Sequence, residues 1–278
     1  MTEFLLDNLL LLPFLFVTYL VLEILEARAE GALERGLGRT RRFGPLFGAL
    51  AGVFPQCGFS AAAASLYAGG AITAGTLVAV FLSTSDELIP VLISEKVPPL
   101  LLFKIVAVKV VAGVTVGFAV NAALKMFGKG GVQLRVDELC AHSRCSCKER
   151  KGVLVPALVH TAEIFVFILI ISGAVELTLH FVGEEGLRNL ILNKPWAGEA
   201  IAGLLGFIPN CAVSVSGAQI YLKAGMSSGA LMAMSLTGSG VGLLVLFRTN
   251  RHWGANFAIL AVLYVTGVVL GRLAGFLI

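Results

Sequence analysis

Two short motifs in this chain combine side chains that could bind a soft ion with a residue that breaks helices. Pro55-Gln56-Cys57 and Pro209-Asn210-Cys211 each place a thiol two residues after a proline, with a side-chain amide between them. Thiolates prefer soft ions such as Cu(I), Zn(II) or trivalent arsenic. Proline removes a backbone donor and interrupts a helix. The pair predicts a site with two thiols and two amides; the alternative is that the cysteines are small packing residues.

The two motifs belong to a longer internal repeat. Residues 52–85 align with residues 206–239 at a constant offset of 154 without gaps, and eleven of the thirty-four positions are identical. The identities include a tyrosine and a serine, Ser60 with Ser214, besides both Pro-x-Cys motifs. Two apolar segments could share Ala, Leu and Gly by chance, but not these residues at fixed spacing. The spacing therefore predicts a duplication that gave two related halves.

Composition places these motifs in a membrane. Of the 278 residues 57% are hydrophobic and only 14% are charged, with a mean hydropathy of +0.91, whereas globular domains have about 25% charged residues. Most of the apolar runs reach the roughly 20 helical residues that cross a bilayer. These runs are 4–25, 44–66, 71–94, 97–124, 153–181, 197–222, 226–247 and 254–277. The sequence predicts an all-α polytopic membrane protein and excludes a soluble fold; nothing indicates nucleic-acid binding.

The runs at 44–66 and 197–222 are interrupted by the prolines, which leaves two pieces of about ten residues, or about 15 Å of helix each. Each run is either a kinked span or a re-entrant hairpin with its Pro-x-Cys tip near the midplane. Basic residues concentrate in the loops 26–43 and 125–152 and at Arg248 and Arg251. Only the hairpin option puts all of them on the cytoplasmic side, as the positive-inside rule requires.

The predicted fold therefore has two inverted-topology repeats, each with three full transmembrane helices and one broken or re-entrant hairpin. Counting the hairpin arms separately gives ten helices. We assign residues 1–128 to the first repeat, 129–152 to a cytoplasmic basic linker and 153–278 to the second repeat. Inverted repeats with broken helices usually bind substrate where the halves meet. We therefore expect substrate near the two tips, with Ser60 and Ser214 supplying hydroxyls.

Ionisable side chains within the apolar runs are the next candidates, because a charge in hydrocarbon is costly and usually functional. Asp86 and Glu87 lie in the third run, and Lys104 and Lys109 lie in the fourth. The second half has no counterpart of these residues, so we expect the charge chemistry to belong to the first half. Either a carboxylate simply neutralises a lysine, or it binds a metal ion or a proton and the lysine modulates it.

Two further groups could ligate a metal. His160 opens the fifth run, where a histidine is either an interfacial residue or a substrate ligand. The linker segment CAHSRCSCKER brings Cys140, His142, Cys145 and Cys147 within eight residues. Such soft ligands could hold Zn(II), Cu(I) or an arsenical, although the spacing is not that of a zinc finger. The alternative is a basic linker that only joins the halves.

Segments such as GVFPQCGFSAAAASLYAGGAITAGTLVAVFLSTSDELIP and VHTAEIFVFI resemble a bacterial family of ten-helix heavy-metal exporters. Members of that family are labelled manganese transporters or arsenic efflux proteins, and the family is similar to the organoarsenical permeases. The resemblance covers most of the chain, and it implies export of a toxic or surplus metal species. Mn(II) would favour Asp86, Glu87 and His160 with the amides of Gln56 and Asn210, whereas arsenicals, Cu(I) and Zn(II) would favour Cys57 and Cys211.

These observations predict a metal exporter of the plasma (inner) membrane that works by alternating access. The chain has no phosphate-binding G-x-x-x-x-G-K-[ST] motif, so export would be coupled to protons or ions. One alternative is a permease for trivalent arsenicals or organoarsenicals. Another is an intramembrane enzyme with Cys57 or Cys211 as nucleophile, but a duplicated nucleophile argues against it. We expect membrane lipid and the metal as partners, no cofactor and no enzymatic activity, and leave a homo-oligomer open.

Overall fold

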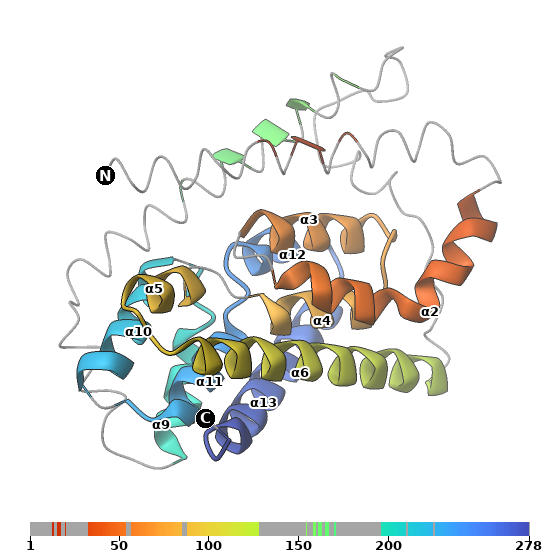
Figure 1. The fold of residues 1–278 in the computed structure, drawn as a ribbon. Helices are drawn as coiled ribbons and strands as arrows, with labels where there is room; N and C mark the ends of the chain where they lie inside the picture. Colours follow the sequence, from red (N-terminus) through yellow and green to blue (C-terminus); the bar gives the residue numbers. More distant parts are fainter. Residues whose placement is uncertain are drawn as a thin grey trace.

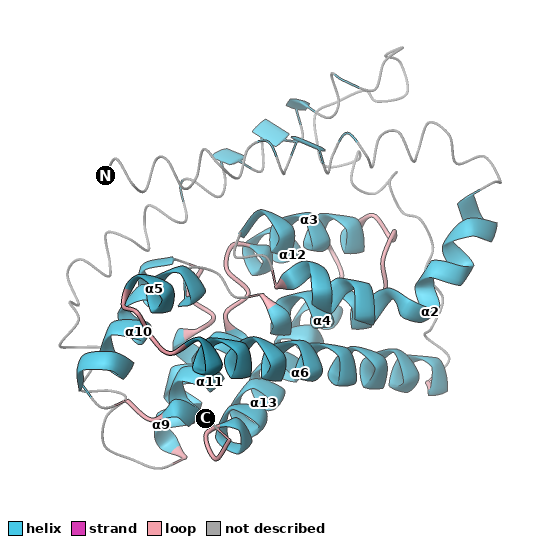
Figure 2. Ribbon diagram, in the orientation of Figure 1, coloured by secondary structure: helices cyan, strands magenta, loops and turns pink. Residues whose placement is uncertain are grey.

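The structure is a computed structural model of the full chain. It describes residues 33–53, 57–84, 88–127, 196–209, 211–224 and 226–277, with isolated positions at 13, 16, 17, 20, 154, 158, 159, 161, 162, 165, 166 and 170. Figures 1 and 2 show helices and loops, and no strand, in this part of the chain. The all-α prediction is confirmed for the described residues.

Ten helices are described, five in each half. In the first half they are α2 (Leu33–Gly52), α3 (Cys57–Ala68), α4 (Ala74–Ser83), α5 (Leu88–Ser94) and α6 (Pro99–Met126). In the second half they are α9 (Ala197–Leu205), α10 (Cys211–Ala224), α11 (Ser228–Thr237), α12 (Gly242–Thr249) and α13 (Trp253–Ala274). The starts of α4 and α6 recur in α11 and α13 at the sequence offset of 154. The repeat therefore extends from residue types to the starts of these helices.

Matching caps explain why the central helices begin where they do. Thr73 and Ser227 are the N-caps of α4 and α11, and they stand 154 residues apart. The hydroxyl of Thr73 accepts from Thr76 N, and that of Ser227 accepts from Ala230 N, both at 3.1 Å. Each bond satisfies one of the amides that a helix start leaves without an internal partner.

The interruption of both Pro-x-Cys runs is confirmed. α2 ends at Gly52 before Pro55, and α9 ends at Leu205 before Pro209. The next described helices are α3 and α10. In each half the run is therefore divided between two helices on either side of the proline, which lacks the N–H that a helix interior needs.

The third and seventh runs are also divided, which the apolar pattern did not predict. α4 ends at Ser83 and α5 begins at Leu88, while α11 ends at Thr237 and α12 begins at Gly242. α4 and α11 have ten residues each, which is about 15 Å or half of a bilayer core. Hydropathy alone misses these breaks because apolar residues continue on both sides of them.

Hydroxyl side chains at these breaks bond back to their own helices. Ser83 Oγ donates to Ala79 O at 2.8 Å, and Thr84 Oγ1 donates to Val80 O at 2.7 Å. Thr237 Oγ1 donates to Ala233 O at 3.0 Å in the second half. Polar groups need partners inside the protein when no water is present, and these short side chains satisfy their own donors without adding bulk.

Each half is built around its most deeply buried helix. α4 packs between α2 and α6, and α11 packs between α9 and α13. Small residues allow these helices to approach closely: a Cβ on Gly117 of α6 would come 2.6 Å from Gly75 O, and a Cβ on Gly271 of α13 would come 2.6 Å from Ala233 N. Glycine at such contacts is typical of helices packed in a membrane.

The remaining helices pair across the halves. α3 packs against α12, and α10 packs against α5, so each half supplies one member of each pair. Figure 1 shows the first of these pairs, with α3 from the orange part of the chain beside α12 from the blue part. The two contacts are equivalent at the offset of 154 residues, since α3 corresponds to α10 and α12 corresponds to α5.

α6 and α13 have outer faces that suit lipid. Both are long and apolar enough to cross a bilayer, as is the stretch Ser228–Thr249 when its break is included. The exposed side chains of α6 and α13 include Leu100, Phe103, Val111, Phe118, Phe257, Val265, Val269 and Leu273. In water such a surface would be unfavourable. It defines a multi-pass membrane protein in which α4 and α11 are shielded from lipid.

Two glycine substitutions on α13 test the close packing. Gly271→Ala should destabilise the protein by about 1–3 kcal/mol, because the new Cβ would overlap the backbone of Ala233 and force α11 and α13 apart. Gly254→Ala is the matched control, since a Cβ there would meet nothing within 4 Å. Thermal unfolding in detergent should give a lower Tm for the first variant alone. Equal Tm values for the two variants would contradict the packing described here.

Candidate functional site

A small cavity lies where the two halves meet. Its volume is about 10 Å³, which is room for one water-sized group. The lining residues are Thr84, Leu88, Ser214, Leu231, Met234, Ser235 and Gly238. They come from the end of α4, the start of α5, α10, and the end of α11. The ends of two half-length helices from different halves therefore converge on one cavity.

Lys109 of α6 reaches the wall of this cavity from the first half. Its side chain is only 1% exposed, and its Nζ donates to Ser235 O at 2.8 Å and to Ser235 Oγ at 2.6 Å. Ser235 lies in the last turn of α11, where carbonyls lack helical partners. A cation is favourable at this end of a helix because the helix dipole is negative there. The contact joins the two halves directly.

The repeat reveals that this arrangement is one-sided. At the offset of 154, Lys109 corresponds to Leu263 and Ser235 corresponds to Phe81; both apolar residues are completely buried. The polar pair beside the cavity therefore has an apolar pair as its counterpart. A duplication supplied equal scaffolds, and only one of them carries a buried charge at this position.

The two crossings between the halves differ in the same way. At the Gly242 crossing, where α12 meets α3, a Cβ on Gly242 would come 2.7 Å from Ser60 Cβ and 2.8 Å from Phe81 Cε1. At the corresponding Leu88 crossing, where α5 meets α10, Leu88 and Ser214 line the cavity instead. α3 and α12 also pack more extensively than α10 and α5. One crossing is tightly closed, and the cavity opens at the other.

The structure brings some of the predicted site residues to this region. Ser214 lines the cavity, Ser60 is fully buried at the Gly242 crossing, and Lys109 lies beside the cavity. Lys104 lies elsewhere: it is exposed, and its Nζ donates to Leu277 O at 2.9 Å, beyond the end of α13. Thr84 and Leu88, which both line the cavity, flank the segment 85–87 in the sequence.

The remaining predicted ligands fall outside the part that the structure describes. These are Gln56, Asp86, Glu87, Cys140, His142, Cys145, Cys147, His160 and Asn210, together with the side chains of Cys57 and Cys211. Among the described residues, no three His, Cys, Asp or Glu side chains come together as a metal site would require. The described part of the cavity instead offers hydroxyls and the Met234 thioether.

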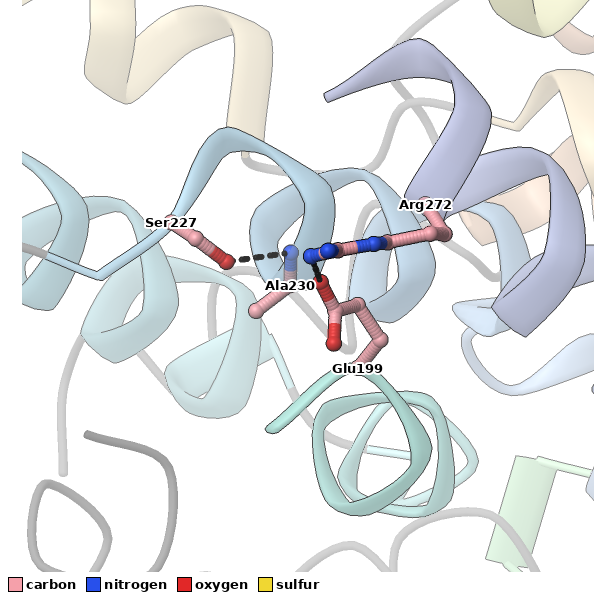
Figure 3. Close-up of polar contacts among 4 residues, drawn as sticks. All are labelled: Glu199, Ser227, Ala230 and Arg272. Atoms are coloured by element: carbon pink, nitrogen blue, oxygen red, sulfur yellow. Dashed lines mark hydrogen bonds and ion pairs between the residues drawn. The ribbon is translucent and has the colours of Figure 1, made fainter. Parts of the chain in front are cut away.

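A second buried charge, which the sequence analysis missed, occurs in the second half. Glu199 in the first turn of α9 is 2% exposed, and its Oε1 accepts from Arg272 Nη1 of α13 at 2.8 Å (Figure 3). The Arg272 guanidinium also lies 5.5 Å from the Trp196 ring and 5.3 Å from the Phe276 ring. The expectation that only the first half carries buried charge is therefore wrong. The sequence did contain a signal for this residue, because Glu199 is the only carboxylate in the apolar run 197–222.

The ion pair between Glu199 and Arg272 holds helices together. Glu199 packs against α11, where a Cβ on Gly229 would come 3.0 Å from its Oε1. Its second oxygen, Oε2, is buried with no hydrogen-bond partner among the described residues. The pair therefore links α9 to α13 around α11, and the arginine is required to balance a carboxylate that water hardly reaches.

Together these features define the class to which the chain belongs: an α-helical multi-pass membrane protein with broken helices that meet at a central cavity. Over residues 9–185 it matches the family ArsP_2, described as "Putative, 10TM heavy-metal exporter". The match spans 177 of the 278 residues (185 − 9 + 1), so the chain belongs to this family. The resemblance noted in the sequence is confirmed. Neither a curated protein nor a solved structure matches significantly.

The ion pair can be tested by removing each partner in turn. Arg272→Met should lower the stability by about 3 kcal/mol, because it leaves a buried carboxylate unbalanced. Glu199→Gln keeps the volume and removes the charge, so it should cost less. Thermal unfolding of the two single variants and of the double variant gives the coupling free energy between Glu199 and Arg272. If the two single losses of stability add up to the loss in the double variant, the two side chains do not depend on each other.

Proposed function

We propose that this protein exports a metal or metalloid ion by alternating access, with the substrate bound at the cavity between the two halves. The observation that carries the proposal is the convergence of the α4 and α11 ends on that cavity. Transporters built from inverted repeats bind their substrates at such breaks, where unwound backbone and helix ends provide ligands. The family to which the chain belongs supports heavy metals as the substrate class.

The relation between the halves supports an inverted repeat. Lys104 near the start of α6 bonds to Leu277 beyond the end of α13, so the corresponding helices α6 and α13 place opposite ends together. Reciprocal pairing of α3 with α12 and of α10 with α5 agrees with a twofold axis. With the basic loops facing the cytoplasm, this axis lies in the plane of a plasma (inner) membrane, and each Pro-x-Cys segment is a re-entrant hairpin.

The ligands are divided between hard and soft donors. Thr84 and Leu88 bound the acidic segment, so Asp86 and Glu87 belong at the cavity in this proposal. Cys57 and Cys211 begin α3 and α10, the helices that contribute to the two crossings. Carboxylates would suit Mn(II), and thiolates with the Met234 thioether would suit Cu(I) or trivalent arsenic. His160 and the amides of Gln56 and Asn210 belong to the hard set in this proposal.

Alternating access follows from the unequal crossings. In the present state the Gly242 crossing is closed, and the cavity lies at the Leu88 crossing. If the Leu88 crossing closed and the Gly242 crossing opened, the cavity would become accessible from the other side of the membrane. The chain has no phosphate-binding loop, so an ion or proton gradient supplies the energy.

Cells with and without the gene provide the primary test. Expression should lower the cell-associated content of at least one member of a panel of Mn(II), Zn(II), Cu(I) and arsenite, measured by elemental mass spectrometry. Asp86→Asn should abolish this effect if the ion is hard, and Cys57→Ser or Cys211→Ser if it is soft. Thr115→Val is the control, because Thr115 is an exposed residue of α6 that bonds only to its own helix. An unchanged content of every metal would refute export.

A steric test addresses the site itself. Ser214→Leu should reduce export at least tenfold, because the larger side chain fills the cavity. Ser214→Ala keeps the space and should retain most of the activity. Both proteins must appear in the membrane at the level of the unmodified protein. If the leucine variant exports normally, the substrate does not pass through this cavity.

A further inference from the structure

We propose that the ammonium group of Lys109 is a built-in cation, which fills a monovalent-cation site at the end of α11. The protein would then need no Na⁺ or K⁺ at this position. The inference rests on the contacts of Lys109 and not on the identity of the transported metal. It adds to the proposed transport function a role for a buried lysine that the transport proposal does not use.

Two of the ligands of the ammonium are of the kind that an alkali cation takes. A backbone carbonyl and a hydroxyl, both from Ser235, contact Nζ at 2.8 and 2.6 Å. The carbonyl belongs to the last turn of a half-length helix, where the partial charge is negative. In transporters with broken helices, such carbonyl ends coordinate Na⁺ or receive protons. Lys109 brings the positive charge to this place on its own side chain.

Burial makes the charge costly, so its presence requires a reason. Lys109 is 1% exposed, and a buried ammonium is unfavourable without compensating partners. An apolar alternative exists in the same fold, because the counterpart of Lys109 is Leu263 and the counterpart of Ser235 is Phe81. The scaffold can therefore be packed without a cation. The lysine is present only where the α11 end borders the cavity.

The ammonium of Lys109 is covalently attached, so it differs from a bound ion that can dissociate. It cannot leave during the transport cycle, so the charge stays at the cavity wall and links α6 of one half to α11 of the other. A positively charged substrate would need acidic side chains to offset it, which the sequence offers at Asp86 and Glu87. Replacement of the lysine by a short side chain should leave an empty site that small cations can enter.

Chemical rescue tests this site without any metal substrate. In purified Lys109→Ala protein, methylammonium chloride or NaCl should raise the Tm by roughly 3 °C or more relative to choline chloride at equal ionic strength, and the effect should saturate. The unmodified protein should have the same Tm in all three salts. Lys104→Ala is the matched control, because Lys104 also donates to a backbone carbonyl but is exposed; it should show no rescue.

Lys109→Met separates charge from volume, since methionine fills similar space without a positive charge. It should have a lower Tm than the unmodified protein, and methylammonium should not raise it. If Lys109→Ala does not fold alone, the yield of monodisperse protein purified with methylammonium should exceed the yield with choline. A Lys109→Met protein as stable as the original would overturn the proposal, and so would equal behaviour of Lys109→Ala in methylammonium and choline. These outcomes do not depend on whether the protein exports metal.

Discussion

The main constraint on this protein is that helices ending inside a membrane must find partners for their last carbonyl groups within the protein. α4 and α11 end after ten residues, a length of about half a bilayer core. Ser83, Thr84 and Thr237 satisfy their own hydroxyl donors on the preceding turn. The carbonyl of Ser235 is satisfied from the opposite half, by Lys109. The hydrogen bond that satisfies this carbonyl thus also joins the two halves.

The two halves have matching helices but different side chains where they cross. Helix boundaries, N-caps and close glycine contacts recur at an offset of 154 residues. Side chains at the crossings do not: Phe81 with Gly242 on one side corresponds to Ser235 with Leu88 on the other. A bulky residue facing a glycine closes the first crossing, whereas a serine facing a leucine leaves the cavity at the second. The two halves therefore share a scaffold but differ in the contacts at their crossings.

The buried charges follow the same division between scaffold and site. Glu199 and Arg272 link α9 to α13 within one half, so they contribute to the stability of that half. Lys109 and Ser235 link different halves beside the cavity, so movement between the halves must change their surroundings. Burial is similar for Glu199 and Lys109. The two residues differ in what they connect: Glu199 joins two helices of one half, whereas Lys109 joins the two halves.

Much of the fold could be predicted from the sequence by itself. The apolar runs determined a helical membrane protein, the offset of 154 residues determined the duplication, and the prolines at positions 55 and 209 determined two of the helix breaks, because proline lacks the amide that a helix needs. Only the tertiary structure decided the breaks after Ser83 and Thr237, since no proline stands at either break and apolar residues resume beyond both. It also decided the partner of Lys109, which lies 126 residues away. Sequence spacing specifies what a helix can do locally, whereas the contact between Lys109 and Ser235 depends on how two halves dock.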